Sequence, residues 1–152
     1  TLTHGGGFGA QVTVEGLGLI LGHGVSRFET RPDHPNAPGP GKRPLHNMCP
    51  TVVSRKGKPI LALGGRGGRR IPNAVVDVLL RFAGESASMK DAVAAPRLHT
   101  EGNKTVTLET GWPETTIRHL ESVGYSVARG KVARVDAASF VPQTRATSTA
   151  WR

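Results

Sequence analysis

The chain has 152 residues, of which 37% are hydrophobic and 20% are charged, values typical of a single soluble globular domain. Twenty Lys and Arg residues against 11 Asp and Glu residues give a net charge of +9, which attracts nucleic acid, acidic surfaces or carboxylate substrates. Cys49 is the only cysteine, so a disulfide within the chain and a cysteine-based zinc site are excluded. No apolar run reaches membrane-spanning length, and we expect a soluble protein of the cytoplasm or the periplasm.

The first 50 residues are rich in glycine and proline. Two short apolar runs, 10–14 and 17–21, predict strands separated by a turn at Gly16. Residues 29–50 contain six prolines, which lack the backbone N–H that a sheet or a helix interior requires. We therefore expect this Pro-rich stretch to be a functional loop within one domain that extends over residues 1–152.

From residue 51 onward, strand and helix patterns are mixed. Residues 51–54 and 60–63 predict a hairpin that turns near Gly57. The remaining patterns predict helices over 72–82, 86–94 and 113–123 and strands over 105–109, 125–128 and 132–140. This mixture indicates an α+β fold built in layers.

The stretch GGRGGRR, residues 64–70, places four glycines and three arginines directly before a predicted helix. Backbone N–H groups in such a turn point into one concavity, and the helix dipole adds partial positive charge there. A phosphate-binding loop would need Gly-Lys-Ser/Thr, whereas Gly68 is followed by Arg69 and Arg70. An oxyanion hole, a nucleic-acid contact through Arg66, Arg69 and Arg70, and a turn needed only for packing remain open.

The histidines give no sign of a metal site. The chain has six of them, without His-x-His or His-Glu-x-x-His spacing. There is also no recognisable Ser-His-Asp motif. We therefore expect neither a metal nor a cofactor.

Three blocks together resemble the small subunit of gamma-glutamyltranspeptidases. They are TLT…FG…GLGLILGHGVSRF (1–28), GPGKRPLHNMCPTVV (39–53) and GGRGGRRIPNAVV (64–76), and DAVAAPRLH (91–99) continues the match. That family comprises N-terminal-nucleophile hydrolases with an αββα sandwich. The resemblance implies the small-subunit part of that sandwich, an antiparallel sheet with flanking helices. It also implies a self-cleaving precursor whose large-subunit half is the partner.

The resemblance implies catalytic roles for a few residues. In the family, the new N-terminal Thr of the small subunit attacks the amide, with its own α-amine as base. The matching glycine pair, Gly67 and Gly68, would donate N–H groups to the tetrahedral oxyanion. Thr1 is a candidate catalytic residue, although it matches an interior threonine that supports the nucleophile. We therefore expect the nucleophile upstream of Thr1, and an isolated chain that is a truncated, inactive small subunit.

The substrate-binding positions differ from those of the family. Residues that grip the glutamyl group there correspond here to Thr3, Gly24, Arg27, His46 and Asn47. Arg27 replaces an acid, and like charges at about 4 Å in a partly buried pocket cost on the order of 4 kcal/mol. If Arg27 points inward, we expect a dicarboxylic monoamide such as a glutaryl amide, its carboxylate bound by Arg27, His46 and Asn47. If Arg27 points outward, gamma-glutamyl specificity survives.

The preferred interpretation is an amidohydrolase or acyltransferase that acts on a small-molecule amide or peptide, without nucleic acid or membrane as partner. We also expect self-association, because a truncated half exposes an apolar edge or face. The alternative is a non-catalytic basic domain that binds nucleic acid or an acidic partner. Steep weakening of binding by salt would distinguish nucleic-acid binding from an amidase pocket.

Overall fold

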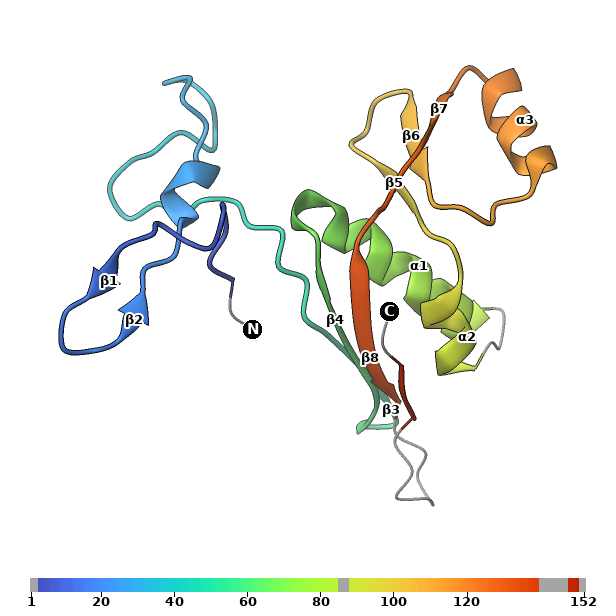
Figure 1. Ribbon diagram of the computed structural model, residues 1–152, viewed down its shortest axis with the longest axis horizontal. Helices are drawn as coiled ribbons and strands as arrows, with labels where there is room; N and C mark the ends of the chain where they lie inside the picture. Colours follow the sequence, from blue (N-terminus) through green and yellow to red (C-terminus); the bar gives the residue numbers. More distant parts are fainter. Residues whose placement is uncertain (1–2, 85–87, 140–147, 151–152) are drawn as a thin grey trace. The chain divides into compact units, whose positions relative to one another are not determined.

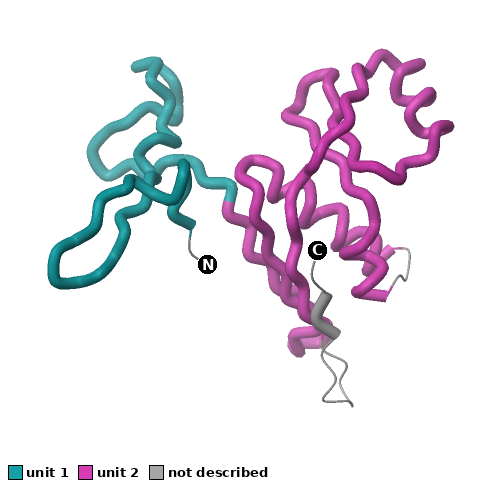
Figure 2. Tube along the Cα trace, in the orientation of Figure 1, with its two compact units in different colours: residues 1–47 teal, residues 48–152 magenta. Residues whose placement is uncertain are grey.

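The computed structural model describes residues 3–84, 88–139 and 148–150. The chain divides into two compact units, residues 1–47 and residues 48–152 (Figure 2). No helix in the described ranges is both long enough and apolar enough to cross a bilayer.

The unit of residues 1–47 contains little regular structure. Strands β1 (Thr13–Val14) and β2 (Leu19–Ile20) pair antiparallel, and a 3-10 turn, η1 (Gly24–Arg27), follows them. Both strands are shorter than the predicted runs 10–14 and 17–21. Gly16 and Gly18 have φ angles of 77° and 62°, so the chain is already turning where the apolar run begins. After η1, the rest of this unit forms turns, without a further helix or strand.

In the second unit, four strands form an antiparallel sheet in the order β3–β4–β8–β9. They are β3 (Thr51–Arg55), β4 (Lys58–Arg66), β8 (Arg134–Ser139) and β9 (Ser148–Ala150). Because side chains alternate along a strand, one face of this sheet carries Leu61, Leu63, Val135 and Ala137. Helices α1 (Ile71–Gly84) and α2 (Met89–Ala94) pack on that face (Figure 1).

A second, three-stranded sheet lies beyond α2 in the chain. It has the order β5 (Leu98–Thr100), β6 (Thr105–Leu108) and β7 (Ser126–Arg129). Helix α3 (Glu114–Ser122) connects β6 to β7, which are therefore parallel, as such a crossover requires. Val106, Leu108 and Ile117 form a small core between this sheet and α3.

The α+β class is confirmed, and most predicted elements of the second unit are present within a few residues of their expected bounds. The predicted helix 86–94 is observed from Met89, capped by Ser88, and residues 86 and 87 lie outside the described ranges, as does Phe140 of the last predicted strand. The sequence did not predict β5, β9 or the parallel pairing of β6 with β7. Both missed strands have only three residues, too few to show an alternating pattern.

Candidate active site

Gly67 and Gly68 form the turn between β4 and the helical segment that starts α1. The pairing of β4 with β8 ends at Arg66 and Arg134, so both glycines lie beyond the sheet ladder. Gly67 has φ 145°, and a Cβ atom there would lie 2.8 Å from the Cβ of Ala133. Gly68 has φ 65° and open space where its Cβ would be. Gly67 is thus required by close approach and by conformation, and Gly68 by conformation alone.

The turn continues as a short 3-10 helix, η2 (Gly68–Arg70), which leads directly into Ile71 of α1. The Arg70 N–H donates to the Gly67 carbonyl at 3.4 Å. Strand, glycine turn and helix start therefore follow one another within a few residues, which places the glycine turn at the start of a helix, where backbone N–H groups can bind an anion. The direction of the glycine N–H groups toward a reacting oxygen stays a prediction.

The two arginines after the glycines are engaged within the protein. Arg70 Nη1 donates to the Lys131 carbonyl at 2.8 Å, which joins the turn to the segment before β8. Arg69 Nη1 lies 3.7 Å from a carboxylate oxygen of Glu101, and both side chains are exposed. Arg70 keeps its positive charge in this bond and the Arg69–Glu101 pair is exposed, so these contacts do not test the nucleic-acid alternative.

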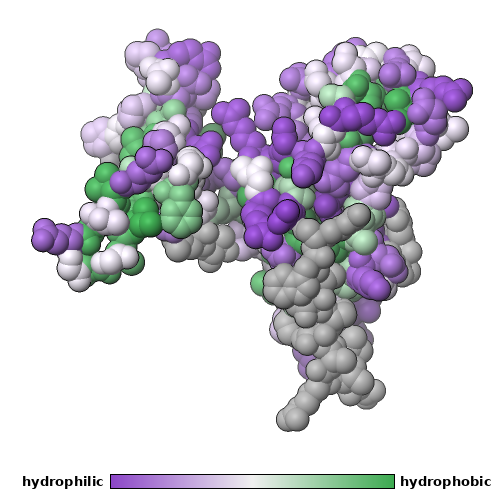
Figure 3. Space-filling model, viewed as in Figure 1, coloured by the Kyte–Doolittle hydropathy of each residue, from purple (hydrophilic) through white to green (hydrophobic). Residues whose placement is uncertain are grey.

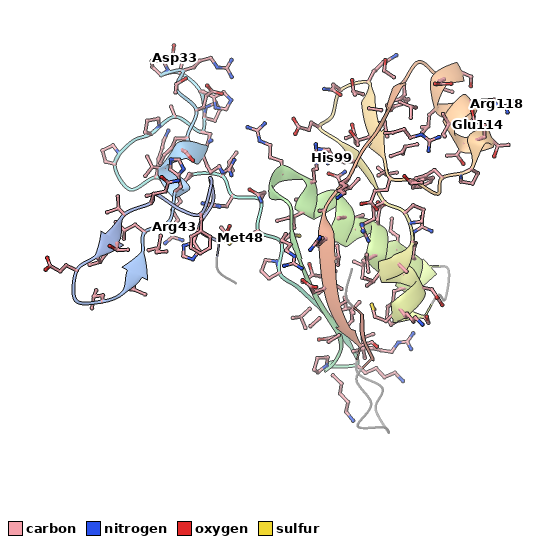
Figure 4. All side chains as sticks on the ribbon, in the orientation of Figure 1. Asp33, Arg43, Met48, His99, Glu114 and Arg118 are labelled. Carbon is pink, nitrogen blue, oxygen red and sulfur yellow. The ribbon has the colours of Figure 1, made fainter. Side chains whose placement is uncertain are left out.

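His99 lies beside α1 (Figure 4) and contacts both Asn73 of that helix and Glu101. It is buried on β5, with Nδ1 3.2 Å from Asn73 Oδ1 in the first turns of α1. Its Nε2 is 3.6 Å from the other carboxylate oxygen of Glu101. Asn73, His99, Glu101 and Arg69 thus link the start of α1 to the glycine turn through side chains.

An ion pair between the buried Arg97 and the half-buried Glu109 lies beside the three-stranded sheet. Arg97 is 4% exposed, its Nη2 lies 3.3 Å from Glu109 Oε2, and its Nη1 donates to the Val93 carbonyl at 2.7 Å. Glu109 also accepts from the backbone N–H of Arg97 at 3.1 Å and of Val132 at 3.1 Å. The pair therefore connects the segments before β5, after β6 and before β8. Arg97 lies in the block DAVAAPRLH, but its role could not be predicted, because the charge of a single arginine does not show that it is buried.

The five predicted substrate-binding residues all lie in the unit of residues 1–47, whereas the glycine turn lies in the other unit. Thr1 lies outside the described residues. Two hydrogen-bonded segments place Thr3 near Gly24, because the His23 N–H donates to the His4 carbonyl at 2.6 Å. A Cβ atom on Gly24 would lie 3.3 Å from His46 Nε2, so the structure does bring Gly24 and His46 together.

Arg27 ends η1 and is half-buried. Its carbonyl accepts from Asn36 Nδ2 at 2.7 Å, and Asn36 Oδ1 accepts from the Leu45 N–H at 3.1 Å. Asn36 thus holds η1 close to the segment that carries His46 and Asn47. The Nε atom of Arg27 is buried and has no hydrogen-bond partner in the described part of the chain.

Comparison with known proteins matches these features to one family. The gamma-glutamyltranspeptidase family model matches residues 1–151. The chain belongs to the gamma-glutamyltranspeptidase family. The glutathione hydrolase proenzyme of Bacillus subtilis (strain 168) is 30% identical over 125 residues, which are 82% of this chain and 21% of that protein. The acylase ACY 1 proenzyme of Pseudomonas sp. (strain SE83) is 33% identical over 155 residues, which cover all of this chain and 28% of that protein.

Solved structures confirm the family fold. A mutant of Helicobacter pylori gamma-glutamyltranspeptidase superposes with a TM-score of 0.86 at 28% identity, over 99% of this chain and 90% of that chain. Cephalosporin acylase from Bacillus halodurans, at 23% identity, a TM-score of 0.81 and 89% of this chain, shares the fold. The gamma-glutamyltranspeptidase resemblance and the N-terminal-nucleophile hydrolase fold expected from the sequence are therefore confirmed. The chain spans 21% and 28% of the two curated relatives described above.

Proposed function

We propose that this chain is the small-subunit part of an amidohydrolase or acyltransferase that works by an N-terminal threonine mechanism. The observation that carries the proposal is the strand–glycine–helix turn at Gly67 and Gly68, in a chain that matches the family over nearly its whole length. In the proposed reaction, a threonine hydroxyl upstream of Thr1 attacks the amide carbon and its α-amine accepts the proton. The two glycine N–H groups would stabilise the oxyanion that forms.

The partner that we propose is the large-subunit half of the same precursor. The relatives described above are named as proenzymes, and this chain covers only part of each of them. The sheet face opposite α1 and α2 is available to such a partner within the described residues. It carries the exposed Val52 and a shallow cavity of about 390 Å³ whose walls include Pro50, Ala62 and Ala138. The same face also carries Asp136, so its apolar part is the part that suits packing against a second sheet.

For the substrate, we propose an amide of a dicarboxylic acid that lacks an ammonium group, such as a glutaryl amide, rather than a gamma-glutamyl amide. Arg27 is half-buried with a buried Nε, which supports the inward alternative. An inward guanidinium repels an ammonium group and favours a carboxylate. The acylase among the relatives indicates that a family member can act on an acyl amide outside glutathione hydrolysis.

The catalytic proposal is tested in the full-length precursor with chromogenic anilides. Gly67→Ala keeps its N–H group but forces the turn away from Ala133. We expect kcat to fall, by up to roughly 10²–10³-fold if the displaced N–H group no longer reaches the oxyanion. The isolated chain is expected to show no turnover. Turnover of gamma-glutamyl anilide by the isolated chain, and its loss in Thr1→Ala, would show that Thr1 itself is the nucleophile and would overturn the upstream position.

Substrate preference is tested with glutaryl and gamma-glutamyl anilides of the same leaving group. We expect faster hydrolysis of the glutaryl compound, and a shift toward the gamma-glutamyl compound in Arg27→Asp. The neutral variant Arg27→Gln separates the loss of the positive charge from the gain of a negative one. Faster hydrolysis of the gamma-glutamyl anilide by the unmodified enzyme would contradict the proposal that the acyl group lacks an ammonium group.

A further inference from the structure

A cavity of about 610 Å³ lies beside the glycine turn, entirely within the unit of residues 48–152. Its walls come from the end of β4, the segment before β5, the residues after β6 and the start of β8. Cavities of roughly 300–1,000 Å³ are typical of small-molecule sites. Gly67 belongs to the wall, so a ligand there would lie next to the proposed oxyanion hole.

The charge of the wall is strongly positive. Four basic residues, Arg66, Arg97, Lys131 and Arg134, face one acid, Glu109. Glu109 is already bound to Arg97 and to two backbone N–H groups, so it is not available to the other three cations. Those three are exposed, and within the described ranges none of them forms an ion pair.

The register of the sheet brings two of these cations together. Arg66 and Arg134 are direct partners across β4 and β8, so their side chains leave the same face of the sheet. Like charges directly opposite one another destabilise a sheet. An anion between the two guanidinium groups would turn that repulsion into attraction.

The third cation is held on a fixed backbone. The carbonyl of Lys131 accepts from Arg70 Nη1 at 2.8 Å, and the next N–H, of Val132, donates to Glu109 Oε1 at 3.1 Å. Both the carbonyl and the N–H group of the Lys131–Val132 peptide are therefore hydrogen-bonded. The ammonium group is therefore carried to the cavity by an ordered segment, which lowers the entropic cost of binding.

We propose that this cavity binds a carboxylate or another small oxyanion through Arg66, Lys131 and Arg134. Two sources share this chemistry: a carboxylate on the amine side of the amide substrate, and a free anion such as phosphate. Anion binding itself does not depend on the proposed catalytic activity. An acidic segment of a partner subunit is the competing occupant.

Calorimetric titration of the full-length protein with succinate and with inorganic phosphate, in dilute chloride buffer, tests the proposal. We expect binding of at least one of these anions and a weakening of roughly tenfold or more in the double variant Arg66→Gln, Arg134→Gln. The matched control is Arg55→Gln, Lys58→Gln. These residues are also basic cross-strand partners, but they lie at the β3–β4 turn and do not line the cavity.

Three outcomes would overturn the proposal. The first is an equal weakening of anion binding in both double variants, which indicates only a long-range charge effect. The second is that neither anion binds. The third is that an anion binds only after the subunits are separated, which shows that the partner subunit occupies the cavity. If the first double variant does not fold, the exposed Lys131→Gln replaces it, with the same expected direction. Arg66→Lys retains the charge and is expected to keep most of the affinity.

Enzyme kinetics distinguish the two sources. Two anilide substrates are compared, identical except for a carboxylate on the leaving aniline ring. If the substrate carboxylate occupies the cavity, the Arg66→Gln, Arg134→Gln variant raises KM for the carboxylated anilide alone. If titration shows lost binding while both KM values stay unchanged, the ligand is a free anion. Either result supports the site, and an inactive enzyme would still leave the titration interpretable.

Discussion

The two units of the chain differ in how much hydrophobic core they contain. Among the described residues, the buried hydrophobic side chains lie in residues 48–152, with the single exception of Ala37. The unit of residues 1–47 instead exposes seven of its large apolar side chains: Phe8, Val12, Leu17, Leu19, Leu21, Val25 and Leu45. Figure 3 shows hydrophobic surface on this unit. Its order rests on turns and backbone hydrogen bonds such as that between His4 and His23.

The two units therefore have different proposed roles. The second unit provides a rigid strand–turn–helix that fixes the glycine pair, whereas the first unit provides the proposed substrate-binding residues on turns. Binding residues are commonly placed on loops, because loop sequence can change without loss of the core. The predicted departures from the family's glutamyl-binding pattern all lie in that first unit, at Thr3, Gly24, Arg27, His46 and Asn47.

The largest expected contrast concerns two ion pairs of nearly equal length. Arg97–Glu109 spans 3.3 Å, with Arg97 buried and 18% of the Glu109 side chain exposed, whereas Arg31–Glu29 spans 3.4 Å at the surface of the first unit. We expect Arg97→Ala to lower the free energy of unfolding by about 3–5 kcal/mol, since the half-buried Glu109 loses its countercharge and the bond of Arg97 to the Val93 carbonyl is lost. Arg31→Ala serves as the control, with no measurable change expected in urea unfolding. Equal effects would contradict the burial of the Arg97 pair.

The next largest expected contrast is between a buried leucine of the second unit and an exposed leucine of the first. Leu61 is fully buried in the main core, and Leu19 is 59% exposed. We expect Leu61→Ala to lower the free energy of unfolding by about 2–5 kcal/mol and Leu19→Ala by less than about 0.5 kcal/mol. Urea denaturation measures both values. A large effect of Leu19→Ala in the full-length protein, together with a small effect in the isolated chain, would show that a partner covers Leu19.

Two glycine substitutions, one in each unit, compare the cost of backbone strain with and without a close neighbour. Gly67→Ala must adopt φ 145° and displace Ala133, and we expect a loss of about 1–3 kcal/mol from the backbone strain alone. Gly16→Ala also has positive φ, but its Cβ would meet open space, so about 1 kcal/mol is expected. Thermal unfolding compares the two variants. A tolerated Gly67→Ala would indicate that the turn can relax.

The smallest effect concerns pH. Burial raises the pKa of Asp77 above its usual range, and the hydrogen bond from the Leu98 N–H works in the opposite direction. A carboxyl whose pKa is raised by folding binds its proton more tightly in the folded state, so stability falls as the pH rises from the unfolded to the folded pKa. Asp77→Asn removes this loss of stability, and its side-chain oxygen can still accept the hydrogen bond from the Leu98 N–H.

We therefore expect Asp77→Asn to be slightly more stable than the unmodified chain at neutral pH, with the difference shrinking as the pH falls through the folded pKa of Asp77. The measurement is the unfolding midpoint between about pH 3 and pH 7, a window that begins below the ordinary pKa of an aspartate. Asp33→Asn, in an exposed turn of the first unit, makes the same charge change without burial. Identical pH profiles for the two variants would show that burial of Asp77 has no effect.

Elements whose side chains alternate or repeat over several residues could be predicted from the amino-acid sequence alone. Helix α1 and the β3–β4 hairpin were predictable because apolar residues recur at the period of each structure. The glycine turn was predictable in position, since glycines between a strand and a helix have few structural alternatives. The family was also identifiable from spaced motifs.

Contacts between residues far apart in the chain could not be predicted in this way and are known from the three-dimensional fold. The parallel pairing of β6 with β7, the burial of Arg97 against Glu109 and the approach of Ala133 to Gly67 join positions far apart in the chain. So does the pairing of Arg66 with Arg134 at the rim of the cavity. Local periodicity carries no information on these contacts, because they depend on strand order and register, which are set by packing of the whole unit.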